Sequence, residues 1–162
     1  MKNTIVALCV LACAAILTSG CEKFRENRQY DSLYDHSAAE SSYHDIFRLT
    51  MQVLGPGANL IVDPCITKTP VAGGFILTFG DSCTDLYEIS RQGSLTITGT
   101  GDIYTEGTVV NANPNSLTIN GMKVEGALTI TTLALNADGK RQFKYVVSNA
   151  IVTDADGSNS TW

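Results

Sequence analysis

After Gly57, short runs of β-branched and aromatic residues alternate with glycine, proline and asparagine, and this rhythm restricts the fold more than any other sequence feature. The expected strands cover residues 60–62, 65–67, 75–79, 93–99, 108–110, 117–119 and 122–135. Strands this short, with turn residues between them at this density, are typical of antiparallel sheets. The sequence therefore predicts a mainly-β domain, either sandwich-like or a single curved sheet.

The longer runs alternate apolar with polar residues, which predicts a sheet with one buried face and one wet face. The residues assigned to the buried face are Leu95, Ile97, Val124, Leu128, Ile130 and Thr132. Residues 136–139, Asn-Ala-Asp-Gly, are a hairpin signal. The strand that returns from this hairpin contains Phe143, Tyr145 and Val147 at alternate positions.

One amphipathic helix is expected ahead of the strands, at residues 38–54. Ser37 and Glu40 have capping-box spacing, and the Gly-Pro-Gly at 55–57 ends the pattern. The stripe at helical spacing contains Ala39, Tyr43, Ile46, Phe47, Thr50, Val53 and Leu54. The polar face is assigned to Ser41, Ser42, Asp45 and Arg48. A helix of this length is marginal alone, so its stripe is expected to pack on the apolar face of the sheet.

The N-terminus has the form of a bacterial export signal. Lys2 precedes an apolar run at 4–17, and the small residues Thr18, Ser19 and Gly20 stand directly before Cys21. This resembles a lipobox, in which the cysteine receives a diacylglycerol, although Thr18 stands where the motif usually has leucine. We therefore expect a signal peptide at 1–20, a flexible tether at 21–36 from lipidated Cys21, and a helix-plus-β domain at 37–162. The alternative is an ordinary secretory signal that contains a chance cysteine.

Cysteine usage agrees with export. Cys9 and Cys13 leave with the signal peptide and Cys21 takes the lipid, so Cys65 and Cys83 remain as one pair. An even remainder in an exported chain predicts a disulfide, worth roughly 3 kcal/mol in the chain-entropy model. The alternative is two buried free thiols. A metal site is less favoured because no histidine lies near either cysteine.

Charge excludes one class of partner. Without Lys2, the chain has 10 basic residues against 16 acidic ones, hence a net charge of −6 with neutral histidines. Nucleic acid is therefore not expected as a partner, because phosphate binding requires a basic surface.

Few residues suggest chemistry. Asp154, Asp156 and Ser158 have the alternate spacing of a calcium loop, but without the downstream glutamate they are assigned to a polar turn. Asp85 and Glu88 could be offered as a glycosidase pair, yet spacing in sequence does not fix their separation. The histidines, His36 and His44, are far in sequence from any nucleophile. We expect no catalytic, cofactor or metal residues, and no enzyme.

Three segments carry a family resemblance: 76–84 (Ile-Leu-Thr-Phe-Gly-Asp-Ser-Cys-Thr), 93–97 (Gly-Ser-Leu-Thr-Ile) and 117–126 (Leu-Thr-Ile-Asn-Gly-Met-Lys-Val-Glu-Gly). Over roughly residues 60–130 the chain resembles a group of uncharacterised lipoproteins from Bacteroidota. The resemblance implies a lipobox, a short helix and a β domain, but no chemistry. Thr78 and Ser82 depart from the group, which often has Asp and Gly there. Such proteins commonly continue beyond the position of Trp162, so the sheet is expected to be open to further strands.

These features favour a membrane-anchored exported lipoprotein of the bacterial cell envelope, with the outer membrane preferred, facing the periplasm or the cell surface. Its folded domain is expected to be a non-catalytic binding or structural module. Its expected partners are the membrane, through the lipid anchor, and an envelope protein or polysaccharide. The alternative is a carrier of a small apolar ligand, with the helix closing a cavity over the sheet.

Overall fold

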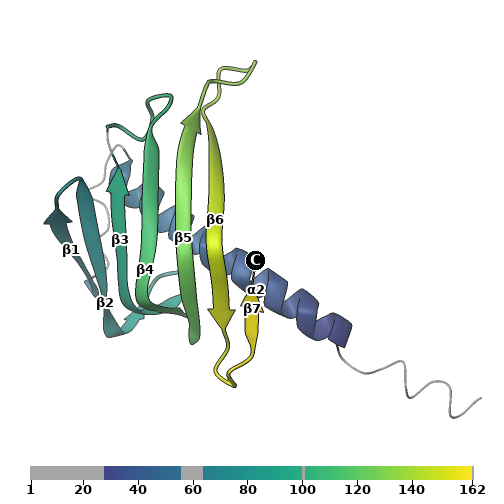
Figure 1. The fold of residues 1–162 in the computed structure, drawn as a ribbon. Helices are drawn as coiled ribbons and strands as arrows, with labels where there is room; N and C mark the ends of the chain where they lie inside the picture. The colour runs from purple at the N-terminus through teal and green to yellow at the C-terminus, as the bar shows by residue number, and fades with distance from the viewer. Residues whose placement is uncertain (1–27, 56–63, 100, 162) are drawn as a thin grey trace, which may run out of the picture. The chain divides into compact units, whose positions relative to one another are not determined.

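The computed structural model describes residues 28–55, 64–99 and 101–161, which form one helix and seven strands (Figure 1). The elements are α2 (Arg28–Leu54), β1 (Ile66–Val71), β2 (Gly74–Thr84), β3 (Ser90–Gly99), β4 (Val109–Ile119), β5 (Met122–Leu133), β6 (Gln142–Thr153) and β7 (Asn159–Thr161). The predicted signal peptide, Cys21 and the predicted strand at 60–62 lie outside the described residues.

Each strand pairs antiparallel with its neighbours in the chain, so the sheet order is β1-β2-β3-β4-β5-β6-β7. This confirms the predicted mainly-β antiparallel fold with one helix. The prediction left open a sandwich-like form or a single sheet, and the described residues form a single open sheet. The chain divides into two compact units, residues 1–36 and 37–162, and α2 continues from the first into the second. The packing described below belongs to the second unit.

The predicted start of the helix is wrong. Ser37 and Glu40, expected to cap it, lie inside α2, which begins at Arg28. No glycine or proline occurs between residues 28 and 54, so no residue interrupts the helix upstream of Ser37. Residues 28–36 of the predicted tether are therefore helical, while 21–27 lie outside the described residues. The predicted end is confirmed: α2 stops at Leu54, and the N–H of Gly55 donates to the carbonyl of Met51 at 2.9 Å.

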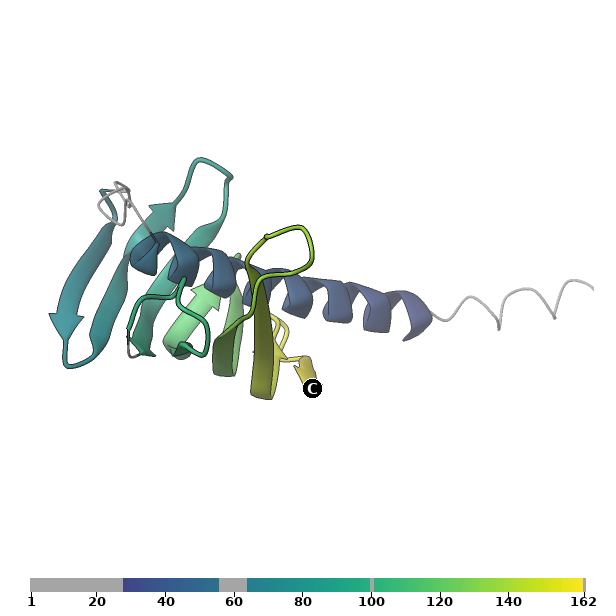
Figure 2. The same cartoon turned by 90° about the horizontal axis from the view of Figure 1, so that it is seen from above.

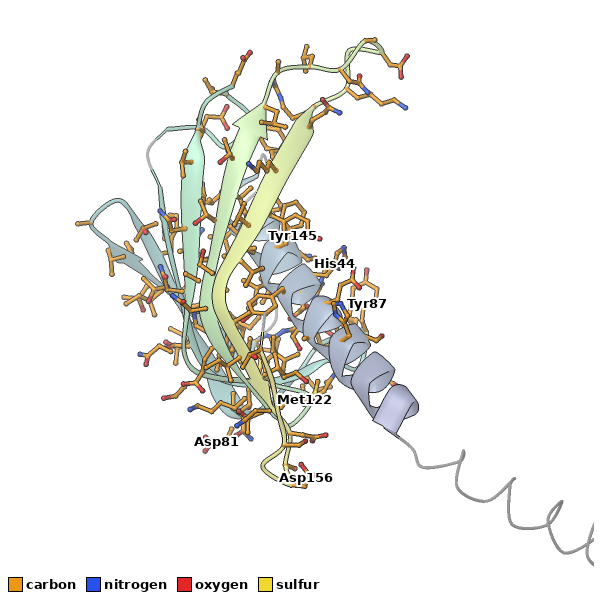
Figure 3. All side chains as sticks on the ribbon, turned by 45° about the vertical axis from the view of Figure 1, so that its right-hand side comes forward. His44, Asp81, Tyr87, Met122, Tyr145 and Asp156 are labelled. Atoms are coloured by element: carbon orange, nitrogen blue, oxygen red, sulfur yellow. A yellow bond between two sulfur atoms is a disulfide. The ribbon has the colours of Figure 1, made fainter. Side chains whose placement is uncertain are left out.

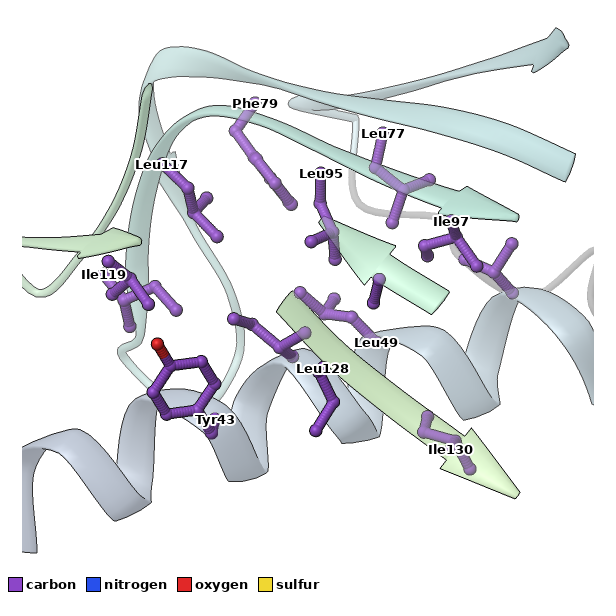
Figure 4. Packing of buried hydrophobic residues seen from close by; sticks show 14 of the residues in the cluster. Tyr43, Leu49, Leu77, Phe79, Leu95, Ile97, Leu117, Ile119, Leu128 and Ile130 are labelled. Atoms are coloured by element: carbon purple, nitrogen blue, oxygen red, sulfur yellow. The ribbon is translucent and has the colours of Figure 1, made fainter. Parts of the chain in front are cut away.

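The predicted stripe of α2 covers one face of the sheet (Figures 2 and 4). Ala39, Tyr43, Ile46, Thr50 and Val53 are buried, together with Leu49, which the prediction omitted. Opposite them lie the fully buried side chains of Leu95, Ile97, Leu128 and Ile130. Phe47 and Leu54 are only partly buried. Full burial of a leucine or isoleucine contributes about 2 to 3 kcal/mol, so this helix–sheet interface forms the core of the domain.

Three predicted strands need corrected boundaries. β2 continues past Gly80 and Asp81 to Thr84. The predicted strands at 108–110 and 117–119 are the two ends of one strand, β4, which begins at Val109 rather than at residue 108. Both strands contain a register shift, between Phe79 and Cys83 in β2 and between Ala112 and Leu117 in β4. A bulge interrupts the apolar alternation, so each continuous strand resembles two pieces in sequence. The strand predicted at 122–135 is β5, and it ends at Leu133 rather than at residue 135.

The bulge in β4 requires a glycine on the neighbouring strand. Gly93 in β3 has φ +88°, and a Cβ placed there would lie 2.1 Å from the carbonyl oxygen of Ser116. Any side chain at position 93 would force β3 and β4 apart, so glycine is required where the two strands approach most closely.

Two local predictions about covalent and turn structure are confirmed. Cys65 and Cys83 form a disulfide with Cα atoms 5.1 Å apart, which joins the residue before β1 to the end of β2. The hairpin at 136–139 connects β5 to β6, with the N–H of Gly139 donating to the carbonyl of Asn136 at 2.9 Å. The disulfide thus fixes the edge of the sheet near the bulge in β2.

Candidate functional site

Four charged side chains meet between α2 and the β2–β3 end of the sheet. We call them the ionic cluster: Asp45 and Arg48 from α2, Asp85 from the β2–β3 loop and Arg91 from β3. The sequence assigned Asp45 to the polar face of the helix, which is wrong, because its side chain is 4% exposed. With two carboxylates and two guanidinium groups, the cluster is neutral overall.

Arg91 lies at the centre of the ionic cluster, and its side chain is fully buried. Its Nε and Nη2 donate to the two carboxylate oxygens of Asp45, each at 2.7 Å, in a bidentate pair. Its Nη2 also donates to Asp85 Oδ2 at 2.9 Å. Burial alone would lower the pKa of Arg91, but its hydrogen bonds to the carboxylates of Asp45 and Asp85, together with their negative charge, outweigh burial and raise the pKa. Arg91 is therefore a permanent buried cation.

Arg48 closes the ionic cluster from the solvent side. Its Nη2 donates to Asp45 Oδ1 at 2.8 Å and to Asp85 Oδ2 at 2.7 Å, and its side chain is 26% exposed. The two arginines thus join the same two carboxylates, so removing any one member leaves unbalanced charge within the other three. Buried pairs of this kind depend strongly on each partner because an isolated buried charge is costly.

Asp85 connects the ionic cluster to the β2–β3 loop, residues 85–89. Its Oδ1 accepts the backbone N–H groups of Tyr87 at 2.9 Å and Ile89 at 3.1 Å, while its Oδ2 accepts both arginines. Burial alone would raise the pKa of Asp85, but these hydrogen bonds from Ile89, Arg91, Arg48 and Tyr87 lower it to about 2. One carboxylate therefore fixes the loop and joins it to the helix.

The fixed loop presents two apolar residues to solvent. Leu86 is 99% exposed and Tyr87 is 73% exposed. The guanidinium carbon of Arg48 lies 5.3 Å from the centre of the Tyr87 ring, so the ring stands beside α2 (Figure 3). The backbone of Glu88 has φ 61°, a left-handed conformation that the hydrogen bonds of Asp85 hold in place. The loop is thus exposed at its tip and hydrogen-bonded at its base.

The opposite flank of α2 is aromatic. The Phe47 ring lies 6.3 Å from Phe143 and 5.7 Å from Tyr145, and Tyr104 lies 6.1 Å from Phe143, measured between ring centres. We call these four residues the aromatic cluster. Tyr145 remains 48% exposed. The aromatic cluster contacts β6 near the side of the sheet opposite to β1, so the two flanks of the helix use different chemistry.

Tyr43 lies between these flanks, on the sheet side of α2. It is 5% exposed, and its hydroxyl donates to the backbone carbonyl of Glu125 in β5. Burial raises the pKa of Tyr43 to about 12, so the hydroxyl stays protonated and keeps its donor role. The bond ties the helix to the region where the pairing of β5 with β6 shifts register.

The other candidates from sequence lie apart from the ionic cluster. Residues 154–158 form the turn between β6 and β7, where the carboxylate of Asp156 accepts the N–H of Ser158 at 2.8 Å. That bond lowers the pKa of Asp156.

Glu88 is exposed at the loop, while Asp85 is occupied by four donor groups, so the two do not form a glycosidase pair. His36 and His44 are exposed on α2. Within the described residues, no group of three His, Cys, Asp or Glu side chains is placed to hold a metal ion.

A hollow of about 220 Å³ lies beside the disulfide and the start of β3. Its lining residues are Asp81, Cys83, Ser90, Arg91, Gln92, Thr118 and Gly121. Gln92 crosses it to donate to the backbone carbonyl of Asp81 at 2.8 Å. The side-chain amide of Gln92 is therefore already paired at this hollow.

Sequence reasoning missed Arg91 and the burial of Asp45. A weak signal existed for Asp45, because it shares a helical row with Ser42 and Leu49, three residues before it and four after it, and both are buried. Its partner Arg91 is 46 positions away, and no local pattern connects the two.

Comparisons with protein-family models, curated proteins and solved structures find no match to this chain. Among the helices of the described residues, none combines the length and apolar character needed to cross a membrane.

Proposed function

We propose that this protein is an exported bacterial lipoprotein, anchored to a membrane of the cell envelope through Cys21, whose folded domain is a non-catalytic binding module. The lipobox-like segment before Cys21 supports the anchor. The Cys65–Cys83 disulfide supports export, because such bonds persist in oxidising compartments and are rare in the cytosol.

One observation carries the binding role: Leu86 is almost fully exposed on a loop that the ionic cluster holds from inside. If the loop were mobile, ordering it on binding would cost conformational entropy and weaken the affinity. The loop 85–89 is already fixed before a partner binds, so that cost is avoided. Tyrosine and arginine are also the residues that contribute most often to protein interfaces, and Tyr87 stands against Arg48. The binding surface is therefore the loop 85–89, and the partner is an envelope protein with an apolar recess.

The carrier alternative receives less support. An apolar ligand held between helix and sheet would need space beside Ile46, Leu49 and Leu128, but these side chains are at most 2% exposed and belong to one packed cluster. Opening a cavity there would remove the contacts that hold α2 to the sheet.

Lipidation is tested by metabolic labelling with an alkyne fatty acid. The wild-type protein should be labelled and sediment with membranes, and Cys21→Ala should be unlabelled. Equal labelling of the two would contradict the anchor. Cys65→Ala is a useful comparison, because it removes a cysteine outside the lipobox and should keep the label.

The binding surface is tested by placing a photo-crosslinking amino acid at Leu86 or Tyr87 in the full-length protein in cells. Both positions should give an adduct of the same mass, and the control position Thr105, exposed on the β3–β4 connection, should give none. Leu86→Asp should compete poorly with the wild type for the same adduct. Absence of a protein adduct at 86 and 87, or equal adducts at 105, would reject the loop as the binding surface, and adducts with polysaccharide alone would change the class of partner.

A further inference from the structure

The two edges of the sheet differ. The edge strand β1 carries Pro70, which has no N–H to offer a neighbour, and Lys68, and both features discourage further pairing. At the other edge, β7 pairs only with Ile151–Thr153 of β6. In the part of the chain that the structure describes, no strand lies along the outer side of residues 142–150.

The backbone groups that face this open edge follow from the pairing of β5. The N–H of Thr132 donates to the carbonyl of Thr108 at 2.9 Å, and its own carbonyl accepts the N–H of Gly107 at 2.9 Å. Both groups point away from β6, so Thr132 and its partner Phe143 form a non-hydrogen-bonded pair. The N–H and C=O of Phe143, and by alternation those of Tyr145 and Val147, therefore face the open edge.

Each face of the sheet carries one exposed apolar side chain beside this edge. Tyr145 shares a face with α2, where its ring meets Phe47, and it is 48% exposed. Val146 points to the opposite face and is 44% exposed. A strand added along β6 would cover both side chains at once and would satisfy the edge-facing backbone groups.

Charge defines the added strand further. Lys144 lies on the same face as Val146 and makes no ion pair with any residue in the described ranges. An acidic residue opposite Lys144 would be favourable, while an apolar residue would suit the face that contains Tyr145. The complementary strand therefore alternates apolar with acidic residues.

We propose that residues 142–148 of β6 accept an extended segment of a partner protein as an added antiparallel strand, with apolar and acidic residues alternating along it. Backbone hydrogen bonds to residues 143, 145 and 147 supply affinity, and the alternation supplies specificity. This surface adjoins the aromatic cluster, on the flank of α2 opposite the loop 85–89. It goes beyond the function proposed above and depends on neither the lipid at Cys21 nor the loop.

The test is amide hydrogen exchange of the mature protein with a short synthetic peptide of alternating valine and glutamate. In the free protein the amides of Phe143, Tyr145 and Val147 should exchange quickly, while those of Lys144 and Val146 are already bonded to β5. The peptide should slow exchange at the first three by about tenfold or more and leave the other two unchanged. A peptide with lysine in place of glutamate should bind about tenfold more weakly.

Two proline variants form a matched pair. Val147→Pro removes an edge-facing N–H and some packing of a half-buried side chain, so it should lower the thermal midpoint less than Val146→Pro does and abolish the peptide effect. Val146→Pro removes an N–H bonded to β5 and should lower the midpoint. If Val147→Pro fails to fold, the comparison of glutamate and lysine peptides decides alone.

Three results would overturn the proposal. The first is no protection at these amides at millimolar peptide, and the second is peptide binding that protects other amides instead. The third is protection of the same amides without peptide together with a dimer in light scattering, which would place a second copy of the chain on the edge.

Discussion

The two flanks of α2 meet the sheet in different ways. On one flank, Asp45 and Arg48 form ion pairs with Asp85 and Arg91, and every bond has a direction and a specific partner. On the other flank, Phe47 meets Phe143 and Tyr145 through ring contacts 5.7 to 6.3 Å apart. Ring contacts tolerate small shifts, whereas a buried bidentate pair does not. The ionic flank therefore sets the position of the β2–β3 loop, and the aromatic flank contributes burial.

This contrast also predicts how stability is distributed. Buried ion pairs contribute little net stability over apolar residues of the same volume, yet losing one partner is very costly. The aromatic flank should lose stability in proportion to the area removed. Five experiments test that difference.

Arg91→Ala should have the largest effect. It leaves Asp45, which is 4% exposed, without its bidentate partner, and it also removes a donor to Asp85. The free energy of unfolding should fall by about 3 to 5 kcal/mol, measured by urea denaturation at neutral pH. Arg48→Ala, at the 26% exposed partner of the same carboxylates, should cost clearly less.

A double variant separates the effect of the ionic flank on the order of the loop 85–89 from its effect on the stability of the fold. Asp45→Leu combined with Arg91→Met replaces the bidentate pair by apolar groups of similar size and should recover most of the loss. The loop 85–89 should nevertheless lose order, visible as faster amide exchange at Tyr87 and Ile89. If the loop keeps wild-type exchange in the double variant, the ionic flank is not what fixes it.

Phe47→Ala tests the aromatic flank. A fully buried phenylalanine would cost about 3 to 5 kcal/mol, but Phe47 is only partly buried, so we expect about 2 kcal/mol. Phe47→Leu should recover about half of this. An unchanged thermal midpoint for Phe47→Ala would mean that this flank does not hold α2 to the sheet.

Acid should weaken the ionic flank selectively. The pKa of Asp85 is lowered to about 2 in the folded state, below the ordinary value of 3.8. A lowered pKa stabilises the fold above the unfolded value, and this contribution is lost as pH falls from about 4 to 2. The difference corresponds to about 2 kcal/mol. Asp85→Asn should flatten this part of the stability–pH curve, and an identical slope in wild type and variant would refute the assignment.

The fold could be predicted from sequence where burial follows a local period. Leu95 and Ile97 alternate with polar neighbours, and the α2 stripe recurs at helical spacing, so strands, helix and their packing were foreseen. Where a bulge breaks the period, as between Ala112 and Leu117, the prediction divided one strand into two. The helix start was misplaced because a capping-box pattern is short and also occurs inside helices.

The candidate site could not be predicted, because it depends on long-range pairing. Asp45 and Arg91 are charged residues that any local reading assigns to solvent, and only the fold brings them together across 46 positions. Asp85 was noticed as an acid, but its role depends on two arginines from different elements. Leu86 and Tyr87 carried no signal, because two apolar residues in a turn are unremarkable until their exposure is known.

The smallest expected effect on stability is that of Leu86→Ala. Leu86 is 99% exposed and contributes almost no burial, so its truncation should change the free energy of unfolding by less than about 0.5 kcal/mol. Arg91→Ala and Leu86→Ala should thus have very different effects on stability and the same effect on binding, because one removes the support of the loop and the other removes its tip. Adduct yield from a photo-crosslinker at position 87, measured beside urea denaturation, tests both. If Leu86→Ala keeps the full adduct yield while Arg91→Ala abolishes it, the loop matters to the fold rather than to a partner, and the binding surface has to be sought on the other flank of α2, at β6.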